Sequence, residues 1–112
     1  MKIESEAKLV TIYVTTRDKV HGHATYAEII KVCQETGISG VTLVRCQEGY
    51  GQHGQLHTPR LLELSDDLPV RIEVIDEPAK VEALLTKLDD LLSEGLVTVQ
   101  DVHVRRYRPG GK

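Results

Sequence analysis

The chain has no tryptophan and no phenylalanine, and only four tyrosines among its 112 residues. A hydrophobic core must therefore be built from valine, leucine and isoleucine, with tyrosines at its margins. Forty per cent of the residues are apolar, a normal share for a folded domain, and no low-complexity tract is present. We expect a single domain over residues 1–112, with residues 1–7 as a loose N-terminal lead-in and residues 108–112 as a flexible tail.

Other absences argue against whole classes of protein. No apolar run approaches the roughly 20 residues that a membrane-spanning helix needs, and the acidic N-terminal stretch lacks the apolar core of a signal peptide. We therefore expect a cytoplasmic protein without direct membrane insertion. The formal net charge of -3 argues against a general nucleic-acid binder, which usually carries a basic excess.

Motifs of catalysis are also scarce. The two cysteines, Cys33 and Cys46, lack a Cys-x-x-Cys spacing and are interpreted as small buried hydrophobes. Neither a Gly-x-Ser-x-Gly elbow nor a phosphate loop ending in Gly-Lys-Ser/Thr occurs. We therefore expect no catalytic residue and no enzymatic activity. An enzyme that uses Cys46 or a histidine is the least favoured alternative.

Alternating apolar residues predict four strands, at residues 8–15, 41–46, 70–75 and 97–107. The last strand is expected to contain a bulge near Asp101, and the polar segment 17–23 is expected to be a loop.

Two helices are predicted between these strands. Thr25 and Glu28 have the spacing of a capping box, and Gly37 should end that helix in the left-handed conformation. The second helix should be capped by Asp76 and should end at Gly95. Its apolar stripe is the clearest in the chain, at Val81, Leu84, Leu85, Leu88, Leu91 and Leu92.

The order strand, helix, strand, strand, helix, strand predicts an α+β fold. It is the ferredoxin-like βαββαβ arrangement, a four-stranded antiparallel sheet with two helices on one face. The right-handed crossover rule places the third strand between the first two. The other face of the sheet is too apolar at some positions to be fully hydrated, which suggests subunit contact there.

This topology gathers polar residues at one end of the domain: Arg17, His21, His23, His53, His57, Arg60, Glu94 and Gly95. One interpretation is an anion site formed by the arginines, histidine N–H groups and the backbone of a glycine-rich loop with Gly49, Gly51 and Gly54. The alternative is a metal site of His21, His23, His53 and His57, because neutral imidazoles bind zinc, copper and nickel. The third interpretation is a polar loop end that contacts another protein.

Several segments together resemble the family called domain of unknown function 190, whose members are PII-like. They are Gly-Ile-Ser-Gly-Val-Thr-Leu-Val-Arg, Gly-Tyr-Gly, His-Thr-x-Arg-Leu-Leu-Glu-Leu-Ser-Asp-Asp-Leu-Pro-Val and Glu-Gly-Leu-Val-Thr. The resemblance covers about residues 8–107. It implies a ferredoxin-like subunit and, through the nitrogen regulatory PII proteins, a homotrimer.

The PII resemblance also implies a site. The PII segment Gly-Phe-Gly-Arg-Gln-Lys-Gly, at the start of its long loop, is similar to Gly49-Tyr50-Gly51 followed by Gln52, His53 and Gly54. In PII proteins the glutamine and lysine belong to the site where ATP, magnesium and 2-oxoglutarate meet. Here Gln52 keeps the amide and His53 replaces the lysine, so 2-oxoglutarate binding does not carry over.

The leading hypothesis is a PII-like signalling protein that binds a small anionic ligand at subunit clefts, with an adenine nucleotide as a candidate and no required cofactor. Its loop 47–60 would contact a membrane transporter or an enzyme as regulatory target. The expected ligand-binding residues are Arg17, His21, Gly49, Gly51, Gln52, His53, Gly54 and Arg60. The alternatives are a histidine-based metal-binding protein and a structural trimer without a ligand.

Overall fold

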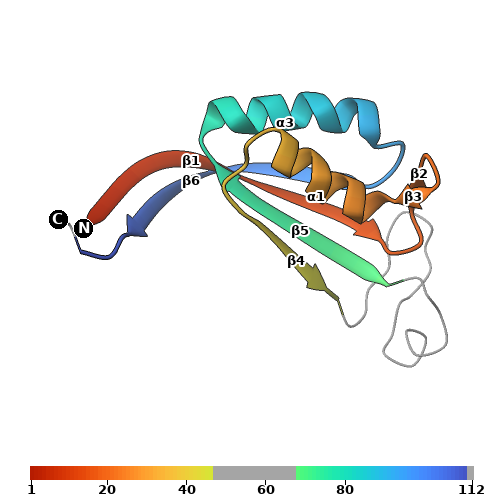
Figure 1. Ribbon diagram of the computed structural model, residues 1–112, viewed down its shortest axis with the longest axis horizontal. Coiled ribbons are helices and arrows are strands. Elements are labelled where there is room, and N and C mark those ends of the chain that lie inside the picture. Colours follow the sequence, from red (N-terminus) through yellow and green to blue (C-terminus); the bar gives the residue numbers. More distant parts are fainter. Residues whose placement is uncertain (47–67, 111–112) are drawn as a thin grey trace.

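The computed structural model describes residues 1–46 and 68–110, which form a four-stranded sheet with two helices on one face, and a small two-stranded sheet beside it (Figure 1). The sheet order is β4-β5-β1-β6, and every neighbouring pair is antiparallel. The bounds are Lys2–Thr15 for β1, Val41–Arg45 for β4, Pro69–Asp76 for β5 and Leu96–Tyr107 for β6. The predicted fold class is confirmed, including the place of β5 between β1 and β4.

The core lies between the sheet and the two helices, α1 (Thr25–Glu35) and α3 (Pro78–Leu91). From β1 it takes alternate residues, Val10, Ile12 and Val14, because side chains alternate between the two faces of a strand. The stripe of α3 is confirmed: Val81, Leu84 and Leu88 are buried, and Leu85, Leu91 and Leu92 pack against them. Among residues 1–46 and 68–110 no aromatic side chain is fully buried, which agrees with the prediction of tyrosines at the margins of the core.

Helix α1 ends as predicted but begins differently. Gly37 has a φ of 77°, and the amides of Gly37 and Ile38 donate to the carbonyls of Gln34 and Cys33. This is a Schellman motif, and Ile38 packs on the core as the motif requires. The predicted capping box is wrong, because Ala24 is the N-cap residue and no side chain caps the helix.

The expectations for both ends of α3 also need correction. Glu77 is the N-cap residue, without a side-chain cap, and Asp76 is the last residue of β5. Pro78 occupies the first turn, where its missing N–H costs nothing. The helix ends at Leu91, before Gly95, because the chain turns there to enter β6.

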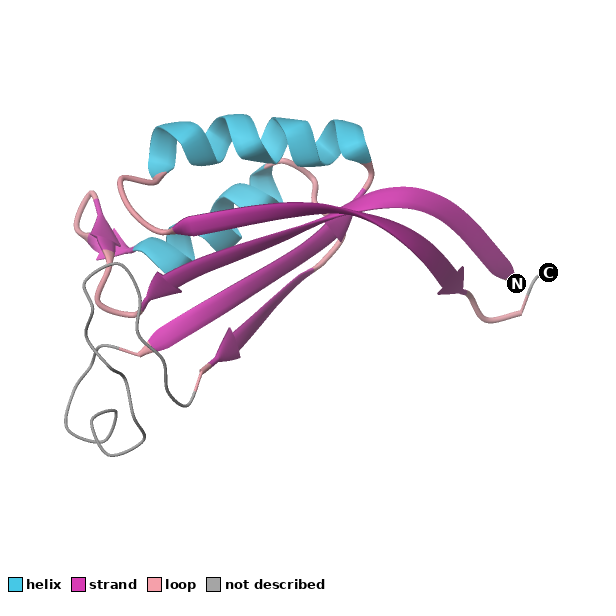
Figure 2. Ribbon diagram, turned by 180° about the vertical axis from the view of Figure 1, so that it is seen from behind, coloured by secondary structure: helices cyan, strands magenta, loops and turns pink. Residues whose placement is uncertain are grey.

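The predicted loose lead-in at residues 1–7 is wrong, because all but the first of these residues belong to β1. Lys2 to Ala7 pair with β6 from Tyr107 back to Val102, beyond the part of β1 that pairs with β5. We call this ribbon, residues 2–7 and 102–107, the arm. It projects from the body and carries both termini near its tip (Figures 1 and 2). Beyond the tip of the arm, the amide of Arg108 donates to the carbonyl of Met1, and the N-terminal amine of Met1 donates to the carbonyl of Arg108. The first residue of the predicted flexible tail, Arg108, is therefore held in place.

Two further local predictions are wrong. The pairing of β1 with β6 is continuous from Lys2↔Tyr107 to Tyr13↔Leu96, so there is no bulge near Asp101. Val97 and Val99 consequently face the helix side, whereas Val102 and Val104 face the opposite side, which we call the open face. The predicted loop 17–23 contains the strand β2 (Lys19–Val20) and the start of β3 (His23–Ala24), which form a small hairpin.

Candidate functional site

The base of the glycine-rich segment is held at one end of the sheet. The amide of Cys46 donates to the carbonyl of Pro69, and the amide of Thr16 donates to that of Leu68. The amide of Leu68 in turn donates to the Thr16 hydroxyl at 2.8 Å. Both flanks of the segment are therefore fixed to the ends of β1 and β5. The expected site residues Gly49, Gly51, Gln52, His53, Gly54 and Arg60, and the alternative metal ligand His57, lie outside the described residues.

The β2–β3 hairpin places His21 at this same end, and Arg17 lies in the connection from β1 to that hairpin. His21 and Gly22 have φ values of 52° and 81°, as a two-residue hairpin turn with a left-handed conformation at both positions requires. Arg17, His21 and His23 are all exposed. Their ring and guanidinium groups are thus open to solvent, where a ligand or a second chain can reach them.

Asp18 organises the connection between β1 and the hairpin. Its carboxylate accepts from the amide of Thr15 at 2.9 Å, and its carbonyl accepts from the amide of Thr25. The second bond satisfies one of the free N–H groups at the start of α1. Sequence reasoning did not single out Asp18, although an aspartate just after a strand is a common turn signal.

Gly95 brings the start of β6 against the end of β1. Its φ is 123°, and a Cβ atom there would lie 3.1 Å from the carbonyl oxygen of Tyr13 and 3.2 Å from Cγ1 of Val14. Only glycine fits this approach without strain. The prediction that the junction of the second helix and the last strand lies at the same end as Arg17 and His21 is therefore confirmed.

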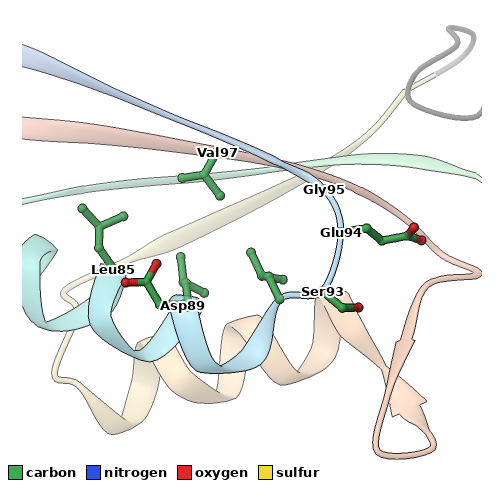
Figure 3. A pocket seen from close by; sticks show the side chains of 8 residues that line it. Leu85, Asp89, Ser93, Glu94, Gly95 and Val97 are labelled. Atoms are coloured by element: carbon green, nitrogen blue, oxygen red, sulfur yellow. The ribbon is translucent and has the colours of Figure 1, made fainter.

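A shallow hollow of about 290 Å³ lies between the last turns of α3 and the start of β6 (Figure 3). Leu85 and Val97 face one another across it, and Asp89 lies beside Leu85. The side chain of Glu94 points away from the hollow. The hollow is lined by Leu85, Leu88, Asp89, Leu92, Ser93, Glu94, Gly95 and Val97. Its lining is therefore mixed, with apolar side chains from α3 and β6 beside polar residues that include Asp89.

Among residues 1–46 and 68–110, no group of three or more histidine, cysteine, aspartate or glutamate side chains converges as a metal site does. His21 and His23 share one small hairpin, whereas the other two proposed ligands lie in the segment 47–67. The histidine-based metal site therefore stays a prediction.

The two described cysteines differ in burial, so the interpretation as small buried hydrophobes holds for Cys33 and not for Cys46. Cys33 is fully buried, and burial raises the pKa of its thiol to about 11, so the reactive thiolate is suppressed. Cys46 is half-buried at the end of β4. Within the part of the chain that the structure describes, no helix is both long enough and apolar enough to cross a bilayer.

A family model described as an uncharacterized ACR, DUF190, matches residues 7–104. This protein belongs to the DUF190 family. Two UPF0166 proteins are similar to it, one from Aquifex aeolicus at 31% identity over 97 residues and one from Methanocaldococcus jannaschii at 35% over 100 residues. These alignments cover 87% and 88% of this DUF190 chain, and 91% and 92% of the two relatives.

Solved structures show the same fold. The structure of CPII, a nitrogen regulatory PII-like protein from Thiomonas intermedia K12 bound to ADP, AMP and bicarbonate, matches with a TM-score of 0.67 at 22% identity. The match covers 91% of each chain. The GlnK–ATP complex of B. subtilis matches with a TM-score of 0.57 at 12% identity, over 87% of this DUF190 chain and 82% of GlnK. The subunit of this DUF190 protein is therefore PII-like in fold.

Proposed function

We propose that this DUF190 protein is a non-enzymatic, PII-like signalling protein that binds a small anionic ligand at clefts between the subunits of a homotrimer. An adenine nucleotide is the leading candidate, and residues 47–60 contact the regulated partner, a membrane transporter or an enzyme. The observation that carries the proposal is the convergence of three features at one end of the sheet. They are the base of the segment 47–67, Arg17 with the adjoining β2–β3 hairpin that carries His21, and the α3–β6 junction.

The nucleotide is supported by the solved structures of like fold. CPII was solved with ADP and AMP, and GlnK with ATP. In this chain the hollow beside α3 offers apolar side chains for a base, and Arg17 offers a cation for a phosphate. A hollow of about 290 Å³ is at the lower limit of the range of about 300–1,000 Å³ for ligand pockets. A second subunit that closes its open side would enlarge and complete such a site.

The trimer is supported by the open face of the sheet. Tyr13 and Ile75 on that face are 41% and 44% exposed, and Leu96 is 58% exposed. An apolar face of this kind is typical of a surface that a second chain covers. The two described helices, α1 and α3, both cover the other face (Figure 1).

Ligand binding is tested by thermal unfolding and calorimetry with ADP, AMP and ATP, each with and without magnesium and bicarbonate. A ligand that binds only the folded state raises its stability by about 2.7 kcal/mol at 100 times its dissociation constant. Arg17→Ala should weaken binding, whereas Lys19→Ala, two residues further along the chain and also exposed, is the matched control. No stabilisation by any of these nucleotides at millimolar concentration would contradict the adenine-nucleotide proposal.

The role of residues 47–60 is tested separately by affinity capture with the wild-type protein and with a variant in which residues 49–57 are replaced by a short Gly-Ser linker. A partner retained by the wild type, lost by the variant and released by nucleotide supports the proposal. Identical capture by both proteins would contradict a partner surface on this segment.

A further inference from the structure

The arm has two chemically different faces. On the helix side its charged residues are paired across the two strands: Glu6 with His103 at 2.7 Å and Glu4 with His103 at 3.1 Å. Arg105 lies 3.4 Å from the same Glu4 carboxylate. The charges of this face are thus largely satisfied within one chain, and they leave little charge unmatched for another protein.

The opposite face of the arm is mainly apolar, with Ser5 and Arg106 as its polar residues, and it continues the open face of the body. Because β1 and β6 pair in register, Ile3, Ala7, Val102 and Val104 lie on the same side as Leu9, Tyr13 and Leu96. Ile3 is 37% exposed. One apolar strip therefore runs from the body to the tip of the arm.

The arm also lacks support from its own chain. Residues 2–7 pair with β6 alone, and β6 is an edge strand of the described sheet, so both outer edges of the ribbon are unpaired within that sheet. A two-stranded ribbon without packing is at best marginally stable in water. No described helix packs against the arm, because the arm projects beyond α3 (Figures 1 and 2).

We propose that the arm is a clasp that lays its apolar face, Ile3, Val102 and Val104, on a second copy of this chain. This inference rests on the proposed assembly and adds to it a contact that a sheet without the arm could not make. At about 3.4 Å per residue the arm reaches roughly 20 Å past the body. The molecule is accordingly 52 Å along its longest axis and 29 Å along the next. That reach exceeds the roughly 10 Å spacing of packed sheets, so the arm can extend over a neighbouring subunit.

The continuity of the arm with the open face indicates a second copy as the occupant. The apolar strip of the arm is one surface with the open face of the body, so one partner covers both most simply. On that face Arg71 and Glu73 stand side by side on β5, 3.4 Å apart, and the Arg71 Nε–H is shielded from water without a hydrogen bond. Because these two charges are paired with each other, they leave little unmatched charge to oppose an apolar contact on that face.

The test compares Ile3→Lys with Tyr107→Lys in the full chain. Both residues are at the tip of the arm, and each new lysine lies opposite a basic residue, Arg106 or Lys2 respectively. Only Ile3 is on the apolar face. Sedimentation over a concentration series measures the concentration at which the assembly dissociates, and circular dichroism checks that both variants fold.

Ile3→Lys should raise the dissociation concentration about tenfold or more, because a charge would be buried in an apolar contact, and Tyr107→Lys should leave it unchanged. Hydrogen exchange in wild-type protein should show arm amides that lose protection on dilution. If the wild type assembles and Ile3→Lys dissociates at the same concentration, the clasp is overturned, but the proposed assembly is not. If both variants weaken assembly equally, the face-specific contact is overturned. A monomeric wild type would contradict the proposed trimer and the clasp together.

Discussion

The carboxylate of Asp76, at the end of β5, accepts a hydrogen bond of 2.8 Å from the amide of Ser39, 37 positions earlier in the chain. Its other oxygen accepts from the amide of Glu77, also at 2.8 Å. Asp76 is only 8% exposed. One buried carboxylate therefore joins the loop after α1 to the start of α3, which fixes how the two helices lie on the sheet.

Asp76→Ala should lower the free energy of unfolding by about 1–3 kcal/mol, because two buried amides would lose their acceptor.

The contribution of Asp76 to stability should also depend on pH. Burial, the largest influence, raises the pKa of Asp76, but the hydrogen bonds from Ser39 and Glu77 and the nearby Lys80 outweigh it, so the net pKa is lowered. A lowered folded-state pKa contributes stability above the ordinary carboxyl pKa, and that contribution is lost as the pH falls through the lowered pKa. Urea unfolding at neutral and acidic pH measures both effects. Asp90→Ala, at an exposed position of α3, serves as control; an equal loss in both variants would contradict the role of Asp76.

Gly95→Ala should destabilise the protein by roughly 1 kcal/mol or more. The residue has a φ of 123°, and the added methyl group would press on the Tyr13 carbonyl at 3.1 Å. Gly40→Ala is the matched control, because no atom lies within 4 Å of a Cβ there and its φ is not positive. Thermal unfolding should separate the two variants. Equal melting temperatures would show that β6 can start without this close approach.

The arm should loosen as the pH rises. Hydrogen bonding to Glu6 and then to Glu4 raises the pKa of His103 above its usual value of 6.5. The contribution of a group with a raised folded-state pKa is fully present below its ordinary pKa and is lost as the pH rises through the raised value. Amide exchange in residues 2–7, corrected for its intrinsic pH dependence, should therefore accelerate above neutral pH.

At acidic pH the same cluster behaves in the opposite sense. Hydrogen bonding to His103 is the main cause of a lowered Glu4 pKa, so the contribution of Glu4 is lost as the pH falls through that lowered value.

The coupling of the arm to pH is tested with two histidine variants. His103→Gln should remove the loosening at alkaline pH, whereas His23→Gln, on the exposed hairpin, should keep it. An arm whose corrected exchange is independent of pH in the wild type would contradict this coupling.

Leu84→Ala should cost about 2–5 kcal/mol, since Leu84 is fully buried where α3 packs on the sheet and the cavity would not refill. Lys87→Ala, on the exposed side of the same helix, should change stability by less than about 0.5 kcal/mol. Denaturant unfolding measures the difference. A small loss at Leu84 would mean that the helix repacks, contrary to the close packing of the core.

The spacing of apolar residues was sufficient to predict the fold, because burial of one face of each strand or helix imposes that spacing. The alternation at Val10, Ile12 and Val14 and the stripe of α3 follow directly from the need to cover one side of the sheet. The arm carries the same signal, since charges fall at the even positions Lys2, Glu4, Glu6 and Lys8. The lead-in prediction missed it because an acidic, exposed stretch resembles an unstructured end when its pairing strand lies about a hundred residues away.

Local end signals failed where distant contacts decide the geometry. Thr25 has the sequence of a cap, but the Asp18 carbonyl already accepts its amide, and the helix begins one residue earlier than a capping box would require. Asp76 was predicted to cap the following helix, yet half of its role is to hold Ser39 from another part of the chain. Neither relationship has a pattern within a few residues.

The sequence by itself determined the order of elements, the two helices on one face and the gathering of Arg17, His21 and Gly95 at one end, because hydrophobic periodicity and chain connectivity depend only on local spacing. Only the tertiary structure decided the close approach of Gly95 to Tyr13, the hydrogen bond from Ser39 to Asp76 and the arm with its paired charges. Each of these depends on atoms far apart in the chain, whose contacts arise only when the sheet is assembled.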